Sequence, residues 1–500
     1  NTSDKPAGFL DPNFPTISGG VGGTYYGTGS YWEYNRASFF GRINYNFNDR
    51  YLFQFTFRED GSSKFGADSR WGFFPSVAVG WRISEEPFFP KNSVISNLKF
   101  RASWGQLGNE NALGKYDFLA RISSYNDMYM GYVQGAGSNP WTGSIARALE
   151  NRSLKWETTD TKNIGFDFGL FGNHLNGNIN YYINETRDLL ITRRIAPSAG
   201  LDNPTLNVGK MRNQGFELEL NWNDKINDFE YNVGFNISTI ANKVVALANE
   251  DQTIYGVGLK YGTEHFPTQT KVGKPIGAFY LYQADGIFQS LEEVQAHKNS
   301  KGELLQPNAQ PGDVRFKDMN GDGVIDEDDK TYSGTGIAKV EANLNLGASY
   351  KGFDFSAVIG SAFGNKLYNG IRYYYEGMNS GSNFLKTTLN AWTPTNTKTD
   401  VPRAIYGDPN QNTRESTRFL ENGDFVRLRQ VQLGYTLPKA LSKHIYCESI
   451  RFYVSAENVF TITGYSGANP EFSQGVLNSG IDRFTYPFSR SYTVGAQVSF

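Results

Sequence analysis

Apolar and polar residues alternate along much of the chain, and this pattern predicts antiparallel strands. From Asn163 to Phe171, one face carries Ile164, Phe166, Phe168 and Leu170, and polar or glycine residues occupy the other face. Successive side chains of a strand point to opposite faces, so such a segment fits a wall between lipid and a wet lumen. After a turn from Gly172 to His174 the alternation resumes, which predicts a hairpin.

Two further hairpins are equally regular. One joins Phe216–Asn223 to Phe229–Ile237, and the other joins Leu344–Tyr350 to Phe353–Ile359 across Lys351 and Gly352. Less regular candidates are Ser38–Phe47, Tyr51–Glu59, Phe73–Ile83, Leu98–Leu107, Phe425–Leu437, Ile450–Phe460 and Tyr492–Phe500. Arg427 and Arg429 interrupt the apolar face of the segment that begins at Phe425. We therefore expect a β-bulge there, or an extension of this strand beyond the membrane.

The connections between these strands alternate between short and long. The short turns are Asn48–Arg50, Gly172–His174, Asp224–Asp228 and Lys351–Gly352, and the long segments are Gly108–Lys162, Glu185–Gln214, Ser238–Ala342 and Ala362–Asp424. Outer-membrane barrels keep short turns in the periplasm and long loops outside the cell. The pattern therefore predicts an all-β, up-and-down transmembrane barrel in the outer membrane.

The pattern predicts about thirteen strands, whereas a bacterial single-chain barrel needs an even number. One undetected strand would raise the count to fourteen. At least one strand should precede the first candidate, either within Val21–Asn35 or outside this chain. We expect residues 1–500 to be the C-terminal part of a barrel. The last strand places Tyr492, Val494, Ala496, Val498 and Phe500 on one face, and many outer-membrane proteins end on an aromatic residue in this way. A soluble β-sandwich with one buried face is the alternative, because it shows the same alternation.

Composition agrees with strands and turns. The chain holds 30 Tyr, 37 Phe, 8 Trp and 54 Gly, a mixture typical of strands and tight turns. The formal net charge of −2 and the lack of a basic run argue against nucleic-acid binding. Cys447 is the single cysteine, so an intrachain disulfide is impossible and thiol-rich metal sites are excluded. No apolar run approaches the about 18 residues of a membrane-spanning helix.

Several short motifs carry a resemblance to a known family. They are Phe40-Gly41-Arg42, Asp49-Arg50-Tyr51-Leu52, Arg58-Glu59-Asp60-Gly61-Ser62-Ser63, Phe65-Gly66, Arg70-Trp71-Gly72, Phe74-Pro75-Ser76, Gly80-Trp81-Arg82, Leu154-Lys155-Trp156-Glu157, Arg212-Asn213, Gly215-Phe216-Glu217, Glu457-Asn458-Val459-Phe460, Thr463-Gly464-Tyr465-Ser466-Gly467 and Asn469-Pro470-Glu471. In this order they resemble the SusC-like (SusC/RagA) branch of TonB-dependent transporters of the Bacteroidota.

The resemblance implies a barrel of 22 strands in the whole family member. It also implies an N-terminal plug domain and a segment that engages TonB, neither of which is recognisable in residues 1–500. By the same resemblance, a SusD-like surface lipoprotein covers the extracellular mouth, and the substrates are glycan oligomers or peptides. The function expected for the chain is therefore outer-membrane uptake of bulky nutrients.

One motif predicts a metal site. Asp318 to Asp329 has the spacing of a twelve-residue calcium loop, with Gly323 at the sharp turn and Asp329 in place of the usual glutamate. Its ligands would be Asp318, Asn320, Asp322, the carbonyl of Val324, Asp326 and Asp329. We expect Ca²⁺ or another hard divalent cation to stiffen this extracellular loop; an acidic turn solvated without metal is the alternative.

Enzymatic signatures are weak. The histidines are His174, His265, His297 and His444, and none is spaced from another as a pair of metal ligands. Carboxylates two apart, such as Glu217 with Glu219 or Asp326 with Asp328, suit a wet lumen better than acid and base catalysis. No catalytic residue is predicted, and a hydrolase within the barrel is the alternative.

Loop aromatics are candidates for substrate contact, lid contact or the membrane-level girdle, without a choice among these roles. They are Tyr125, Tyr129, Tyr132, Trp141, Tyr373, Tyr374 and Tyr375. Two other functions stay open at this stage. One is a surface binding or adhesion protein without transport, and the other is a passive porin.

Overall fold

The computed structural model describes most of the chain in atomic detail. The described residues are 31–90, 94–120, 122–124, 131–132, 141–142, 144–193, 195–248, 252–261, 263–378, 383–444, 446–472 and 474–500. Tyr125 and Tyr129 lie outside them, and so does most of the segment 21–35 in which a further strand was expected. Residues 31–35 precede the first strand without forming one.

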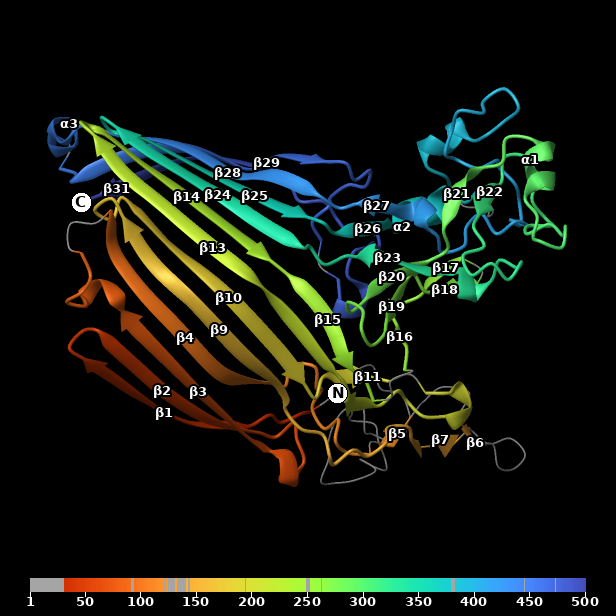
Figure 1. The fold of residues 1–500 in the computed structure, drawn as a ribbon, viewed down its shortest axis with the longest axis horizontal. Helices are drawn as coiled ribbons and strands as arrows, with labels where there is room; N and C mark the ends of the chain where they lie inside the picture. The colour runs from red at the N-terminus through yellow and green to blue at the C-terminus, as the bar shows by residue number, and fades with distance from the viewer. Residues whose placement is uncertain are drawn as a thin grey trace, which may run out of the picture.

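One large antiparallel sheet makes up the wall of the molecule (Figure 1). Its strands, in spatial order, are β1 (Arg36–Phe47), β2 (Tyr51–Ser62), β3 (Trp71–Arg82), β4 (Ile95–Asn109), β9 (Glu157–Leu170), β10 (Leu175–Arg187), β13 (Lys210–Ile226), β14 (Phe229–Thr239), β24 (Val340–Tyr350), β25 (Phe353–Phe363), β28 (Phe425–Thr436), β29 (Ser449–Thr463) and β31 (Ser491–Ser499). A further strand, β15 (Ala241–Ala246), continues β14 and pairs with β13. Each predicted strand is confirmed, and neighbours in the sequence are neighbours in the sheet, as an up-and-down barrel requires.

The register separates an apolar face from a polar face. Ile164 on β9 pairs with Tyr181 on β10, which pairs with Phe216 on β13. Large apolar side chains of this outer row, such as Phe166, Ile179 and Phe216, are exposed, as expected for a surface that meets lipid. The alternate row is polar, and runs through Asp167, Asn178, Glu219, Asn236 and Asn343 on five consecutive strands.

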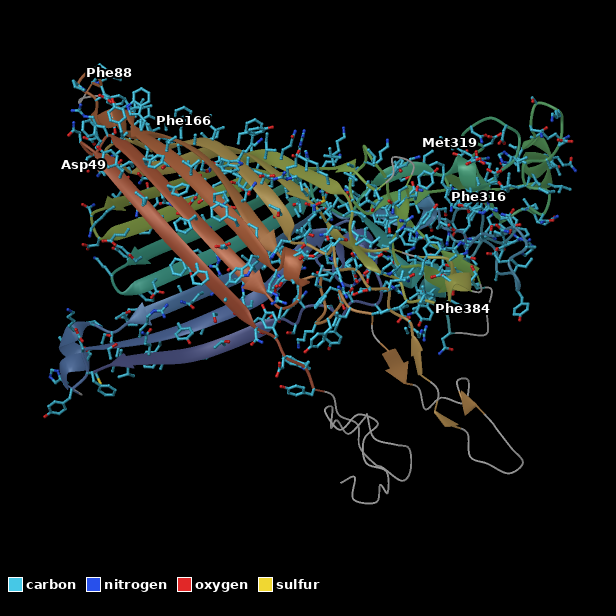
Figure 2. The ribbon with its side chains drawn as sticks, turned by 90° about the horizontal axis from the view of Figure 1, so that it is seen from below. Asp49, Phe88, Phe166, Phe316, Met319 and Phe384 are labelled. Carbon is cyan, nitrogen blue, oxygen red and sulfur yellow. The ribbon has the colours of Figure 1, made fainter. Side chains whose placement is uncertain are left out.

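The short turns lie at one end of the sheet and the long loops at the other. Lys351 and Gly352 both have positive φ, 44° and 89°, the conformation of a type I′ hairpin turn. The turn between β13 and β14 consists of Asn227 and Asp228, shorter than the predicted Asp224–Asp228 because the strands extend further. In Figure 2, Asp49 of a short turn lies at the opposite end of the molecule from Phe316, Met319 and Phe384 of the long loops. Helix α3 (Lys439–His444) lies at the short-turn end (Figure 1).

The expected irregularity in β28 is a bulge. Arg427 pairs with Gly360 of β25 and Gln430 pairs with Val358, but the register shifts between Val358 and Ile359 and leaves Arg429 as an extra residue. Against β29 the register shifts at the same level, and Asn458 there adopts a φ of 51°. Asparagine tolerates this left-handed conformation better than most residues, which explains its place in the motif Glu457-Asn458-Val459-Phe460.

The long loops fold into small sheets and helices rather than extended coils. Their elements are β5 (Ile122–Ser124), β6 (Gly131–Tyr132), β7 (Trp141–Thr142), β8 (Ser144–Ala146), β11 (Leu190–Thr192), β12 (Thr205–Asn207), β16 (Ile254–Tyr255), β17 (Leu259–Tyr261), β18 (Thr263–His265), β19 (Thr268–Thr270), β20 (Ala278–Leu281), β21 (Ala284–Ile287), α1 (Leu291–Ala296), β22 (Val314–Phe316), β23 (Thr331–Thr335), β26 (Lys366–Asn369), α2 (Gly370–Tyr375), β27 (Leu420–Asn422) and β30 (Ile481–Asp482). Among the described residues, no helix is long and apolar enough to cross a membrane.

Candidate functional site

A hydrophobic core holds the long loops together. Its fully buried members are Leu259, Phe279, Leu281, Tyr368, Tyr373, Phe419 and Ile481, and we call this set the loop core. The Tyr373 ring packs 5.5 Å from Phe419 and 6.3 Å from Tyr368, measured between centroids. The Tyr373 ring is fully buried in the loop core, which favours a packing role for this residue. Tyr374 and Tyr375 pack on Phe484, and Tyr374 also packs against Tyr373 at the edge of the loop core.

A groove of about 680 Å³, lined by charged, polar and aliphatic residues, lies beside the loop core. Residues that line it come from β26, α2, β27 and the loop after β29, with Asn369, Arg372, Glu421 and Ser466 among them. Its size is within the ~300–1,000 Å³ range of ligand pockets. Helix α2 begins beside this groove because the Asn369 side chain accepts a 3.0 Å hydrogen bond from the amide of Arg372.

Arg372 is the centre of the groove's charge network. Its Nε donates to Glu376 at 3.0 Å, Nη1 donates to Glu421 at 3.2 Å, and Nη2 donates to Asp400 at 3.2 Å. Burial alone would lower the pKa of Arg372, but the charges of Glu376 and Glu421 outweigh it and raise the pKa. The side chains of Arg372 and Glu376 are almost buried, whereas Asp400 is 80% exposed.

A second arginine lies behind the first. Arg418 donates from Nη2 to Glu376 at 3.2 Å, and its guanidinium lies 4.7 Å from the ring of Phe419 in the loop core. Burial lowers the pKa of Arg418 to about 10. Glu376 thus joins Arg372 and Arg418, which fixes helix α2 to the loop core.

A buried carboxylate ties three further loop segments together. Glu415 is hydrogen-bonded to His265 and accepts a 2.6 Å hydrogen bond from Lys330. Burial would raise the pKa of Glu415, but His265 and Lys330 overcome that effect and lower it to about 2. No sequence pattern indicates this cluster, because the three residues come from distant segments.

The predicted calcium loop forms a compact turn with many internal bonds. Both Asp318 oxygens accept backbone bonds, from Gly321 and Gly323, and both Asp329 oxygens do the same, from Met319 and Asp326. Gly323 has a φ of 92°, as the sharp turn requires. Asn320 bonds to Asp322, and both lie at the surface with Val324. In the described part of the chain, no three His, Cys, Asp or Glu side chains are already grouped as metal ligands, so the metal site stays a prediction.

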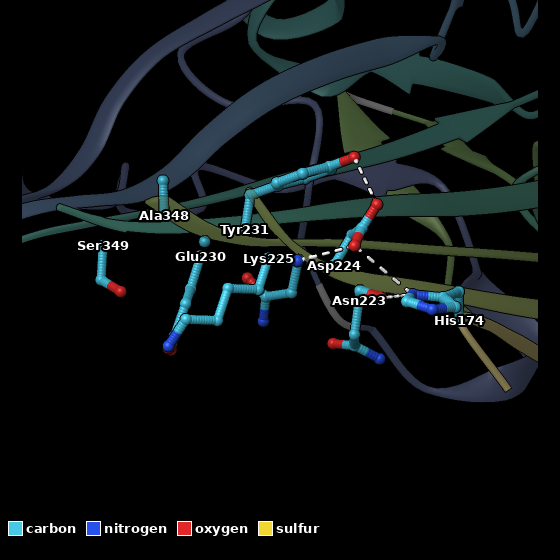
Figure 3. Close-up of a pocket in the computed structure, with 10 residues that line it drawn as sticks. His174, Asn223, Asp224, Lys225, Glu230, Tyr231, Ala348 and Ser349 are labelled. Carbon is cyan, nitrogen blue, oxygen red and sulfur yellow. Dashed lines mark hydrogen bonds and ion pairs between the residues drawn. The ribbon is translucent and has the colours of Figure 1, made fainter. Parts of the chain in front are cut away.

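A second hollow, of about 580 Å³, lies at the short-turn end (Figure 3). The Nδ1 atom of His174 lies 3.1 Å from the Asn223 carbonyl and 3.4 Å from Asp224, and Tyr231 donates to Asp224 at 3.5 Å. His174 is half-exposed, and its ring contacts a backbone carbonyl and a carboxylate. It is therefore a polar residue of the lining of this hollow. Of the other histidines, His297 and His444 each contact one backbone carbonyl.

Comparison with known proteins decides the family. The model of the family "TonB dependent receptor-like, beta-barrel" matches residues 1–459. The chain belongs to this family. TonB-dependent receptor P3 of Formosa agariphila is 31% identical over 477 residues, 94% of this chain and 46% of that protein. TonB-dependent receptor SusC of Bacteroides thetaiotaomicron is 31% identical over 475 residues, 93% of this chain and 44% of that protein.

The fold of a solved structure supports the same family. The RagAB peptide transporter superposes with a TM-score of 0.76 at 27% identity, over 93% of this chain and 48% of the other. The resemblance to SusC-like members is thereby confirmed, and the chain is part of an outer-membrane β-barrel. It spans about half the length of the relatives that it matches.

One of the motifs that carry the family resemblance lines the groove. The motif Thr463-Gly464-Tyr465-Ser466-Gly467, which carried part of the resemblance, contributes Gly464, Ser466 and Gly467 to the groove's lining. Glu421 accepts bonds from the amide and the hydroxyl of Ser466. The sequence contained this one signal for the groove, and it could not be interpreted until the loops were placed.

Proposed function

We propose that the chain forms the barrel wall and outer loops of a TonB-dependent transporter that imports peptides or glycan oligomers across the outer membrane. A SusD-like surface lipoprotein covers its extracellular mouth, and the TonB system supplies the energy. The observation that carries the proposal is the combination of a polar row along the wall with a fold that matches the RagAB peptide transporter over 93% of the chain. The relatives reported above are named as receptors and transporters, and no catalytic role is proposed.

The proposal is tested by uptake in cells. Deletion of the gene should abolish growth on one class of oligomer, and re-expression of the full protein should restore it only when the proton-motive force is intact. Extraction in detergent should recover a surface lipoprotein with the barrel. Uptake that continues after the proton-motive force collapses would identify a passive porin. Surface binding without any uptake would identify an adhesion protein.

We also propose that the loop Asp318–Asp329 binds Ca²⁺ or a similar hard cation. The ligand spacing, the positive φ of Gly323 and the surface position of Asn320 and Asp322 support this role. An extracellular site of this kind needs only weak binding, with a dissociation constant of ~10⁻⁴ to 10⁻³ M. The expected effect is stiffening of the outer loop, not chemistry on a substrate.

A further inference from the structure

We propose that the groove around Arg372 binds peptides through a cationic group, the amine of lysine or the guanidinium of arginine. This inference rests on the proposed uptake function and specifies its substrate class. It concerns the groove between α2, β27 and the loop after β29. Four features of the groove carry it. They are the arrangement of charge, the spare hydrogen-bond acceptors of Asp400, the aliphatic lining, and the lack of aromatic rings among the described lining residues.

The charge of the groove favours a cation. Arg372 and Arg418 are almost buried, and each donates one bond to the buried carboxylate of Glu376. Together with Glu421 and Asp400, the five groups carry a formal charge of −1. The negative end of this network is also its exposed end, because Asp400 is 80% exposed and Arg372 only 16%.

Asp400 supplies exposed spare acceptors to the groove. Within the described residues, Asp400 has Arg372 as its hydrogen-bond partner, and an ionised carboxylate offers about four acceptor positions. Arg372 already uses three of its nitrogens on three carboxylates. A ligand can therefore donate to Asp400 without breaking the network. An anion would find only the two N–H groups of Arg372 that these bonds leave over, and it would lie beside carboxylates that repel it.

The remaining lining suits a peptide better than a sugar. Ile371, Leu385 and Val401 provide aliphatic surface for apolar side chains. Aromatic rings, the usual stacking platforms for bound rings, do not occur among the described lining residues. The nearby tyrosine Tyr373 is occupied in the loop core. Thus an amino sugar would find the charge it needs but no ring to stack on.

The test measures peptide binding by the full-length protein in detergent, which needs no membrane potential. The probes are an N-acetylated pentapeptide with a central lysine and the same peptide with norleucine. Wild type should bind the lysine peptide about tenfold more tightly, with a preference that weakens at high salt. Asp400→Asn should reduce the preference to about threefold or less, and Asp400→Lys should shift it toward a glutamate peptide.

The matched control is Asp202→Asn. Asp202 is also an exposed aspartate in a 3.2 Å ion pair with one arginine, Arg147, but it lies outside the groove. This variant should keep the wild-type preference. Equal affinity of wild type for the two peptides would overturn the proposal, and so would an equal loss of preference in Asp202→Asn and Asp400→Asn.

Two further outcomes separate this proposal from the uptake function. A glucosamine oligomer that binds more tightly than the lysine peptide, and loses affinity in Asp400→Asn, would overturn the peptide assignment. A protein that binds neither peptide but still imports an oligomer in cells would overturn the groove proposal alone. If cells that express the wild-type protein import no oligomer, the proposed uptake function is contradicted, whether or not the purified protein binds the peptides.

Discussion

Glu471 accepts a 3.0 Å hydrogen bond from Nη1 of Arg427, although the two residues are 44 positions apart in the sequence. The same carboxylate accepts a 3.0 Å bond from Arg429, the extra residue of the β28 bulge. Asn469 accepts a further bond from Arg427. The motif Asn469-Pro470-Glu471 therefore ties the last long loop to the barrel wall, and the bulge supplies the second arginine.

Glu471→Gln should loosen this loop. Arg427 is only 4% exposed, so the loss of its carboxylate leaves a buried charge poorly compensated, at a cost of about 1–3 kcal/mol. Hydrogen exchange of the amides from Thr463 to Glu471 should become faster by tenfold or more. Asp228→Asn, which removes a 3.9 Å surface pair with Lys351, serves as the control and should leave exchange unchanged. Equal exchange in wild type and Glu471→Gln would show that the pair does not hold the loop.

The wall of the barrel could be predicted from the sequence because its signal is local. Alternation with a period of two identifies each strand, and the short turns pair neighbours without any knowledge of distant residues. The prediction missed β15, which lies in a segment expected to be a loop, and it made some strands too short. For example, β13 begins at Lys210, well before Phe216, because polar residues continue the strand beyond the lipid.

The groove could not be predicted, because its residues meet only after the loops fold. Asn369, Asp400 and Glu421 are far apart in the chain and have no common period. The sequence pattern instead indicated the run from Tyr373 to Tyr375 as candidate contact residues, yet Tyr373 lies in the loop core. An aromatic residue in a loop is equally suited to packing and to binding, and only its burial distinguishes the two roles.

Gly215→Ala should impair assembly of the barrel. An added Cβ would lie 1.7 Å from the backbone carbonyl oxygen of Thr239, and backbone cannot move aside as a flexible side chain can. The expected cost is about 1–3 kcal/mol, where β13 meets the end of β14. The amount of folded, heat-modifiable protein in the outer membrane should fall severalfold. Gly475→Ala has a nearest contact of 3.9 Å and is the matched control; equal amounts of the two variants would contradict the steric argument.

Asp318→Asn combined with Asp326→Asn should abolish calcium binding by the predicted loop. Wild type should bind Ca²⁺ at ~10⁻⁴ to 10⁻³ M, because the site is exposed and Asp329 is shorter than glutamate. Terbium luminescence, competed by Ca²⁺, measures this affinity, and slower exchange of the loop amides should accompany binding. Asp202→Asn should bind normally. No calcium-dependent signal in wild type at 10 mM would leave the loop as a solvated acidic turn.

Acid should weaken the outer loops through Glu415. Its pKa of about 2 is below the ordinary value of 4.5, so the carboxylate stabilises the fold fully above pH 4.5 and loses this effect as the pH falls toward 2. The difference corresponds to on the order of 3 kcal/mol. Exchange of the amides from Ser416 to Phe419 should therefore accelerate between pH 5 and pH 3, after correction for the intrinsic pH dependence of exchange. Glu415→Gln should exchange faster at neutral pH, because Lys330 loses a buried partner, and should lack the additional acid dependence. The same acid dependence in wild type and Glu415→Gln would assign the effect to other groups.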